Sequence, residues 1–196
     1  MTHFIAHRIN TLNELKQLPH EYGVELDLRD SGNELILQHD PFTEGELFSE
    51  YLKCYQHGTM ILNIKSERIE HRVLELLEEH KIEDYFFLDS SIPMIYLLSK
   101  LGEKRSAVRF SEIESIETVL LMADKVDWVW VDCFNQLPIN TTSYHLLKEA
   151  GLKLCLVSPE LQGRQEDIER YKCYLADQQI QFDAICTKYH NMEAWK

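Results

Sequence analysis

The chain has 196 residues, 44% of them hydrophobic and 27% charged, so it is long enough to bury the core of one domain, which we place at residues 1–196. Its net charge of −13 argues against general binding of nucleic acids or anionic membranes. A small anionic substrate in a locally basic pocket remains compatible with that charge.

Two further features concern the cellular compartment. The five cysteines show no CxxC spacing, which argues against a structural zinc site and is typical of a reducing compartment. The N-terminus MTHFIAHRIN has no basic segment followed by a long apolar stretch, and no apolar run has the length of a membrane span. We expect a cytoplasmic protein without a membrane span, of unknown oligomeric state.

Apolar runs of strand length alternate with segments of helical periodicity. The runs are residues 3–8, 23–29, 34–40, 59–65, 85–90, 106–110, 128–134, 152–158 and 182–188. The helical segments are 11–18, 67–81, 92–102, 115–123, 141–151 and 165–179. This alternation is the pattern of a parallel sheet covered by helices.

The second and third runs are the exception, because a turn sequence, DSGN, joins them directly. If residues 34–40 extend the preceding strand, the chain contains eight strand–helix units, the number that closes a TIM (β/α)8 barrel. We therefore predict an α/β, compact, single-domain TIM barrel with short loops. An open, doubly wound sheet is the alternative.

Polar side chains gather where these strands end. They are His7, Arg8, Glu25, Asp27, His39, Asn63, Lys65, Asp89, Arg109 and Asp132. In a TIM barrel the carboxyl ends of the strands meet at one face, where active sites are found. A single polar residue of this kind is easily structural, so the inference depends on the whole set.

Glu25 and Asp27 stand out within that set. Alternation along a strand places them side by side on one surface, while Val24, Leu26 and Leu28 face the opposite way. Two adjacent carboxylates repel one another, so we expect a cation, a metal ion or open water to compensate them.

Several residues also have structural interpretations. Asp89 with the two serines that follow is a candidate N-cap for a helix over 92–101, and Arg109 is a candidate partner of Glu112. Trp128 and Trp130 are expected to pack against neighbouring helices.

In chain order, three motifs resemble the glycerophosphodiester phosphodiesterase family of TIM-barrel, PLC-like phosphodiesterases. They are IAHRINT at residues 5–11, VELDLR at 24–29 and HDP at 39–41. The resemblance continues more weakly through NIK to ICTK, which stands where the family usually has Thr-Asp. The stretches FLDSSIP, WVWVDCF and LVSPELQGR are similar to a short bacterial branch whose genes often lie beside surface-polysaccharide synthesis genes.

The resemblance implies roles for the clustered residues. Glu25, Asp27 and Asn63 would bind a divalent cation, Mg²⁺ or Ca²⁺. His7 and His39 would be the general acid and base. Arg8, Lys65 and Arg109 would bind the substrate phosphate. Asp89, Glu112 and Asp132 would complete the pocket.

The chain departs from the family pattern at three places. Ile9 stands where the family has Gly, and its Cβ is expected to crowd the phosphate site. Asn63 stands where the family has a second Glu, which removes one charge unless Glu112 or Asp132 compensates. The segment after HDP is short, since about twenty residues separate His39 from the next strand, so we expect a shallow pocket.

These observations favour a metal-dependent phosphodiesterase for a small glycerophosphodiester or a related sugar or polyol phosphodiester. A catalytically degenerate barrel that binds a phosphorylated sugar or glycerol intermediate is the alternative, motivated by Ile9 and Asn63. A third hypothesis, Lys65 as a Schiff-base nucleophile, leaves Glu25, Asp27 and the two histidines without a role.

Overall fold

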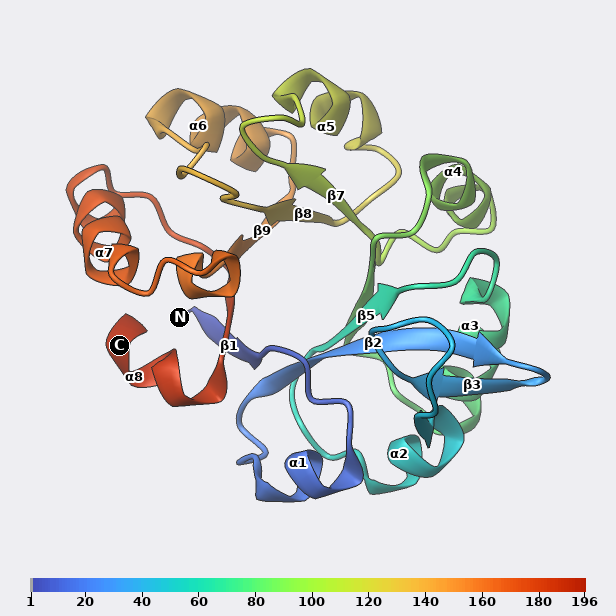
Figure 1. Cartoon of the computed structure of the whole chain (residues 1–196). Coiled ribbons are helices and arrows are strands. Elements are labelled where there is room, and N and C mark those ends of the chain that lie inside the picture. Colours follow the sequence, from blue (N-terminus) through green and yellow to red (C-terminus); the bar gives the residue numbers. More distant parts are fainter. Residues whose placement is uncertain (1) are drawn as a thin grey trace.

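The structure is a computed structural model that describes residues 2–196. Eight parallel strands form a barrel with the helices outside it (Figure 1). The barrel strands are β1 (His3–Ala6), β2 (Gly23–Ser31), β5 (Met60–Ile64), β6 (Tyr85–Leu88), β7 (Ala107–Phe110), β8 (Trp128–Val131), β9 (Lys153–Val157) and β10 (Ala184–Thr187). Strand β1 pairs with both β2 and β10, and a bridge between Phe87 and Ser106 joins β6 to β7. The predicted TIM barrel is confirmed, and the open sheet is wrong.

Each barrel strand is followed by a helix. The α-helices are α1 (Leu12–Gln17), α2 (Phe48–Cys54), α3 (Glu70–Glu79), α4 (Ile92–Lys100), α5 (Ile116–Met122), α6 (Thr141–Glu149), α7 (Asp167–Asp177) and α8 (Met192–Trp195). The short 3₁₀ helices η1 (Pro159–Gln162) and η2 (Tyr189–Asn191) precede α7 and α8. The six predicted helical segments are present. Helices α2 and α8 were missed, and α8, with four residues, is too short to show a helical period.

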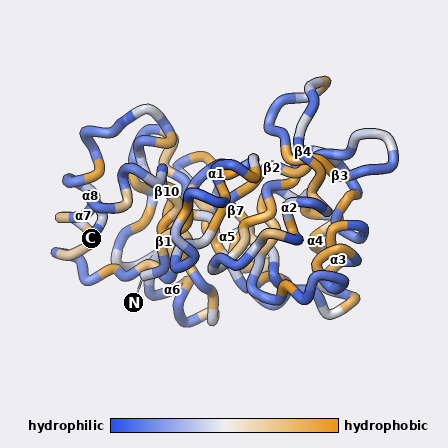
Figure 2. The backbone as a smooth tube through the Cα atoms, turned by 90° about the horizontal axis from the view of Figure 1, so that it is seen from below, coloured by the Kyte–Doolittle hydropathy of each residue, from blue (hydrophilic) through white to orange (hydrophobic). Residues whose placement is uncertain are grey.

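As predicted, the run at 34–40 is not a strand of the barrel. Strand β3 (Glu34–Leu37) pairs antiparallel with the far end of β2, and β4 (Glu46–Leu47) pairs with β3. The segments around β3 and β4 project from the rest of the molecule (Figure 2). Because β2 is long, its outer end leaves the barrel and carries this hairpin above the mouth.

The barrel interior is filled by a separate apolar cluster. It includes Phe86, Trp128 and Trp130, and the rings of Phe86 and Trp128 stack with centroids 4.5 Å apart. The prediction that both tryptophans pack against helices is therefore wrong. The helices instead pack on outward residues of the strands, such as Leu26 and Leu28 of β2.

Several strands end earlier than their apolar runs suggested. Strand β6 stops at Leu88 and β8 at Val131, so Asp89 and Asp132 lie just beyond the strands, at the mouth. Within residues 2–196, no helix combines the length and apolar character that crossing a bilayer requires.

Candidate active site at the barrel mouth

The two acids of β2 are buried in the position that alternation predicts. Glu25 and Asp27 are each 1% exposed, and Asp27 lies beside Asn63 in the register between β2 and β5. Glu25 lies one level deeper, beside Ile61. The pair therefore forms the floor of the mouth and is not in bulk water.

Glu25 is held by three groups from two neighbouring strands. The backbone N–H of Arg8 and the amide Nδ2 of Asn63 each donate to it at 2.8 Å, and His7 Nε2 lies 3.7 Å from Oε2. Burial, together with the adjacent charge of Asp27, raises the pKa of Glu25 to about 7.

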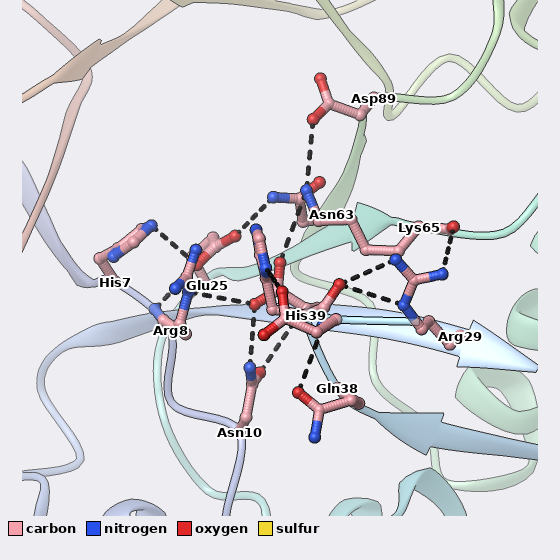
Figure 3. A network of polar contacts seen from close by, with 12 residues as sticks. His7, Arg8, Asn10, Glu25, Arg29, Gln38, His39, Asn63, Lys65 and Asp89 are labelled. Atoms are coloured by element: carbon pink, nitrogen blue, oxygen red, sulfur yellow. Dashed lines mark hydrogen bonds and ion pairs between the residues drawn. The ribbon is translucent and has the colours of Figure 1, made fainter. Parts of the chain in front are cut away.

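Asp27 is compensated mainly by cations and by Asn10. Asn10 donates its Nδ2 to Oδ2 at 2.9 Å and accepts the backbone N–H of Asp27 at 2.9 Å. Arg8 Nε lies 3.5 Å from Oδ2, and Lys65 Nζ lies 3.6 Å from Oδ1. The protein itself thus supplies positive charge to compensate the two carboxylates, because Arg8 and Lys65 both lie against Asp27 (Figure 3).

The loop after β1 sets this arrangement. Thr11 caps α1 in a capping box with Glu14, which fixes the chain just after Asn10. Arg8 adopts φ +58, an unfavourable conformation for a non-glycine residue that directs its N–H toward Glu25. Ile9 is 8% exposed and packs in the core shared with α1 and α2. The expectation that its side chain crowds the mouth is therefore wrong.

The mouth offers oxygen atoms that suit a divalent cation. Asp27 Oδ1 and Asn63 Oδ1 are buried oxygens without a hydrogen-bond partner, and hard oxygen ligands of this kind suit Mg²⁺ or Ca²⁺. Asn63 turns its amide nitrogen toward Glu25. Rotating the amide would place its oxygen beside Glu25 instead. Among the described residues no group of three or more His, Cys, Asp or Glu side chains is arranged to hold a metal. The residues fit a cation through two carboxylates and one amide.

His7 lies at the end of β1, with its backbone N–H bonded to Thr187 of β10. Burial lowers the pKa of His7 to about 4, and the charge of Arg8 contributes in the same direction. The imidazole is therefore neutral near pH 7 and can accept a proton.

His39 reaches the mouth from the hairpin. The backbone N–H of Gln38 donates to the carbonyl of Asp27 at 2.9 Å, and Arg29 donates to the carbonyl of His39 through Nε and Nη2. His39 Nδ1 lies 2.8 Å from Asp40, which leaves Nε2 for proton exchange. The same view holds His7, Glu25 and His39 around one polar cluster (Figure 3).

The remaining predicted residues form a chain of ion pairs along the mouth. Lys65 Nζ lies 3.6 Å from both Asp27 and Asp89. Arg109 donates twice to Asp89, at 2.8 and 2.9 Å, and also donates to Asp132. Arg109 therefore pairs with Asp89 and Asp132 and not with Glu112 as expected, and its donors are already largely engaged.

Neither candidate for the missing acid faces the carboxylate pair. Glu112 accepts the backbone N–H groups of Asn135 and Gln136, and Asp132 is bonded to Arg109 and to Gln162 Nε2. The helix α4 is capped by Ser91 without a side-chain bond, so Asp89 does not serve as its cap. Asp89 adopts φ +61 and turns to the ion-pair chain instead.

Sequence reasoning missed two buried acids near the mouth, and one of them, Glu70 of α3, is 1% exposed and lines a small pocket with Lys65 and Asp89. Glu160 of η1 is 8% exposed and accepts hydrogen bonds from the hydroxyls of Ser158 and Thr187 and from the backbone of Lys188. Trp195 of α8 donates to Ser158 Oγ at 2.7 Å. The Pro at position 159, after a strand, signals only a turn, so no pattern marked this carboxylate.

Solved structures that share the fold include two bacterial proteins. No family model matches the chain, and no curated protein matches it by sequence. A protein from Agrobacterium tumefaciens described as a glycerophosphoryl diester phosphodiesterase superposes with TM-score 0.66 at 15% identity, covering 95% of this chain and 93% of its own. A glycerophosphoryl diester phosphodiesterase from Parabacteroides distasonis gives TM-score 0.64 at 13% identity, covering 99% of this chain and 86% of its own.

The chain has the fold of a glycerophosphoryl diester phosphodiesterase. This likeness extends over nearly the whole chain and confirms the fold that the resemblance of three short motifs implied. At such low identity, the roles of individual residues stay predictions that depend on the geometry described above.

Proposed function

We propose that this protein is a phosphodiesterase that hydrolyses a small glycerophosphodiester, or a related sugar or polyol phosphodiester, at the barrel mouth. The observation that carries the proposal is the buried pair Glu25 and Asp27, with His7 3.7 Å from Glu25 and the cations Arg8 and Lys65 against Asp27. The likeness to two phosphodiesterase folds supports the same reaction class.

The phosphate is held by Arg8 and Lys65 in this proposal. Arg8 is half exposed and contacts Asp27 only at 3.5 Å, so its guanidinium has donors left for a phosphate oxygen. Lys65 supplies a point charge from the opposite side of Asp27. Arg109, bound by Asp89 and Asp132, orders these acids and contributes less to phosphate binding than the sequence suggested.

Glu25, Asp27 and Asn63 would hold the divalent cation, which, when bound, supplies positive charge to a phosphate oxygen and to the attacking hydroxyl. Neutral His7 accepts the proton of the attacking hydroxyl, from water or from a neighbouring hydroxyl of the substrate. As the new P–O bond forms, the bond to the leaving alcohol breaks, and His39 Nε2 gives its proton to that alcohol oxygen.

Lys65 is less suited to the third hypothesis. Its ammonium bridges Asp27 and Asp89 at 3.6 Å each, which is the position of an ion-pair bridge and not of a free amine. The degenerate barrel remains the second candidate, because Asn63 replaces a carboxylate. It predicts thermal stabilisation by glycerol phosphate without product, and multiple turnovers would exclude it.

The test is release of alcohol from glycerophosphodiesters by purified protein, with Mg²⁺ or Ca²⁺ and with chelator. We expect His7→Ala and His39→Ala to lose at least 100-fold in kcat, since general acid–base groups contribute about 10²–10⁴-fold. His71→Ala, an exposed histidine of α3, is the matched control and should keep full activity. Unchanged turnover in both mouth variants, with native melting curves, would refute the roles assigned.

A further inference from the structure

The barrel is least closed between β6 and β7. A single residue pair, Phe87 with Ser106, joins these strands among the described residues, with the N–H of Phe87 donating to Arg105 at 2.8 Å. Every other pair of neighbouring barrel strands shares two or more residue pairs. The wall of the barrel therefore has a seam at this position.

The backbone of β7 turns hydrogen-bonding groups toward that seam. The carbonyls of Ser106 and Phe110 accept from Trp128 and Asp132 of the next strand segment, so the even-numbered residues of β7 bond to β8. By alternation, Ala107 and Arg109 present their backbone groups to β6. Beyond the bridge, within residues 2–196, no strand pairing reaches the carbonyl of Ala107 or the N–H of Arg109.

A cleft of about 660 Å³ lies over this seam, between the first turns of α4 and α5. Its wall is rich in hydroxyls and has an apolar side. The hydroxyl groups come from Ser90, Ser91, Ser115 and Thr118, and the apolar side includes Ile95 and Ile113. Ser90 is 9% exposed and its Oγ has no hydrogen-bond partner, so the cleft wall contains an unsatisfied hydroxyl.

The cleft opens into the mouth. Asp89 and Arg109 line it, and the same Asp89 is 3.6 Å from Lys65, which in turn contacts Asp27. A substrate with its phosphate at Arg8 and Lys65 can therefore extend one substituent past Asp89 into the cleft.

The charges of the cleft select the chemistry of that substituent. Its one cation, Arg109, is bound by Asp89 and Asp132, and Glu114 adds a further acid to the wall. An anionic group would meet more carboxylates than cations there. Hydroxyls can instead pair with serine and threonine side chains and with the free backbone groups of β7, while the isoleucines contact C–H faces.

We propose that this cleft holds the leaving alcohol of the diester, and that this alcohol is an uncharged sugar or polyol. The inference rests on the proposed function, because it assigns the second half of the same substrate. It makes the pocket deeper than the short segment after HDP suggested.

The first test blocks the cleft. Thr118→Trp places an indole at the wall from the exposed face of α5, and Leu121→Trp, at a 77% exposed position on the same helix outside the cleft, is the matched control. The substrates are two glycerol phosphodiesters that differ in one alcohol, glucose or methanol. We expect Thr118→Trp to lower kcat/KM for the glucose diester at least ten-fold, to leave the methyl diester within two-fold, and Leu121→Trp to change neither. Equal effects of Thr118→Trp on both substrates, or no effect, would overturn the proposal.

The second test does not need activity. Free glucose is titrated into the wild-type protein while backbone amide NMR signals are followed. We expect the Arg109 and Ser115 amides to shift in the wild type and in Leu121→Trp, but not in Thr118→Trp. Absence of these shifts in the wild type refutes the cleft assignment even if the enzyme is active. Shifts without any diester hydrolysis would refute the proposed function and leave the cleft as a polyol site.

Discussion

Replacing Asn63 by aspartate tests the cation site directly. In the structure the amide of Asn63 donates to Glu25 at 2.8 Å, and the substitution puts a carboxylate oxygen there instead. Two full charges at 2.8 Å repel by about 6 kcal/mol at an effective dielectric constant of 20. The buried acids avoid this by keeping one proton, which burial and Asp27 already favour by raising the pKa of Glu25 to about 7.

The cost that remains is that of holding this proton near neutral pH, about 1.4 kcal/mol for each pH unit between the solution and the pKa of the pair. For a domain of this size, about 2–4 °C of melting temperature corresponds to each kcal/mol, so Asn63→Asp should melt a few degrees lower in chelator. With a divalent cation this difference should shrink, because a third carboxylate strengthens binding. A ten-fold tighter Kd adds about 1.4 kcal/mol of stabilisation at saturating cation.

Differential scanning calorimetry with Ca²⁺, Mg²⁺ or EDTA measures both effects. Asn63→Leu removes the donor and the oxygen ligand together and is the matched control, expected to lose stability without gaining any cation response. If Asn63→Asp gains no more from either cation than the wild type does, then Glu25, Asp27 and residue 63 do not share a cation, and this part of the proposal is wrong.

Three further predictions concern regions that support the barrel. At its base, His3 Nε2 accepts the N–H of Thr59 at 3.3 Å, and a Cβ at Gly58 would approach the His3 ring to 2.6 Å. Gly58→Ala should lower the free energy of unfolding, measured in urea, by about 1–3 kcal/mol, because its Cβ meets the His3 ring. Most of that cost should vanish in a His3→Ala background. If the costs of the two substitutions simply add, the contact does not exist. Burial lowers the pKa of His3 below 6.5, so the unfolded chain binds the proton more readily than the folded protein does. The free energy of unfolding should therefore fall as the pH drops below about 6.5, and His3→Gln should make this fall less steep. Near the mouth, Glu160→Leu should cost about 2–4 kcal/mol by leaving the Thr187 hydroxyl and a backbone N–H unpaired, whereas Glu160→Gln should cost less than half of that, and equal losses in chemical denaturation would refute the network.

The fold and the acid pair were predictable because both follow from local rules. Alternation in β2 places Glu25 and Asp27 on one face whatever the rest of the chain does. The strand–helix rhythm limits the topology to a few parallel arrangements, and eight units close a barrel. His7 and Lys65 also follow, since each stands at the carboxyl end of a parallel strand.

What failed depends on which strands become neighbours. Arg109 was matched with Glu112, three residues away, but β7 lies between β6 and β8, so its side chain meets Asp89 and Asp132 instead. Glu160 lies in a 3₁₀ turn without periodicity, and its partners come from β9, β10 and the chain end. The seam between β6 and β7 could not be predicted either, because it reflects where two short strands diverge and not what either contains.

The charges at the mouth show why a cation matters to the proposed reaction. The protein carries a net charge of −13, and at the mouth the two cations Arg8 and Lys65 only balance the two carboxylates Glu25 and Asp27. The neighbouring cation, Arg109, is outnumbered by Asp89 and Asp132. Side chains alone thus offer an anionic diester little net attraction, and the positive charge must be added. Asp27 Oδ1 and Asn63 Oδ1 are buried oxygens without a hydrogen-bond partner, and they lie where such a charge would be added. The acids that repel the substrate in the bare protein are therefore the ones that would bind the ion needed to attract it.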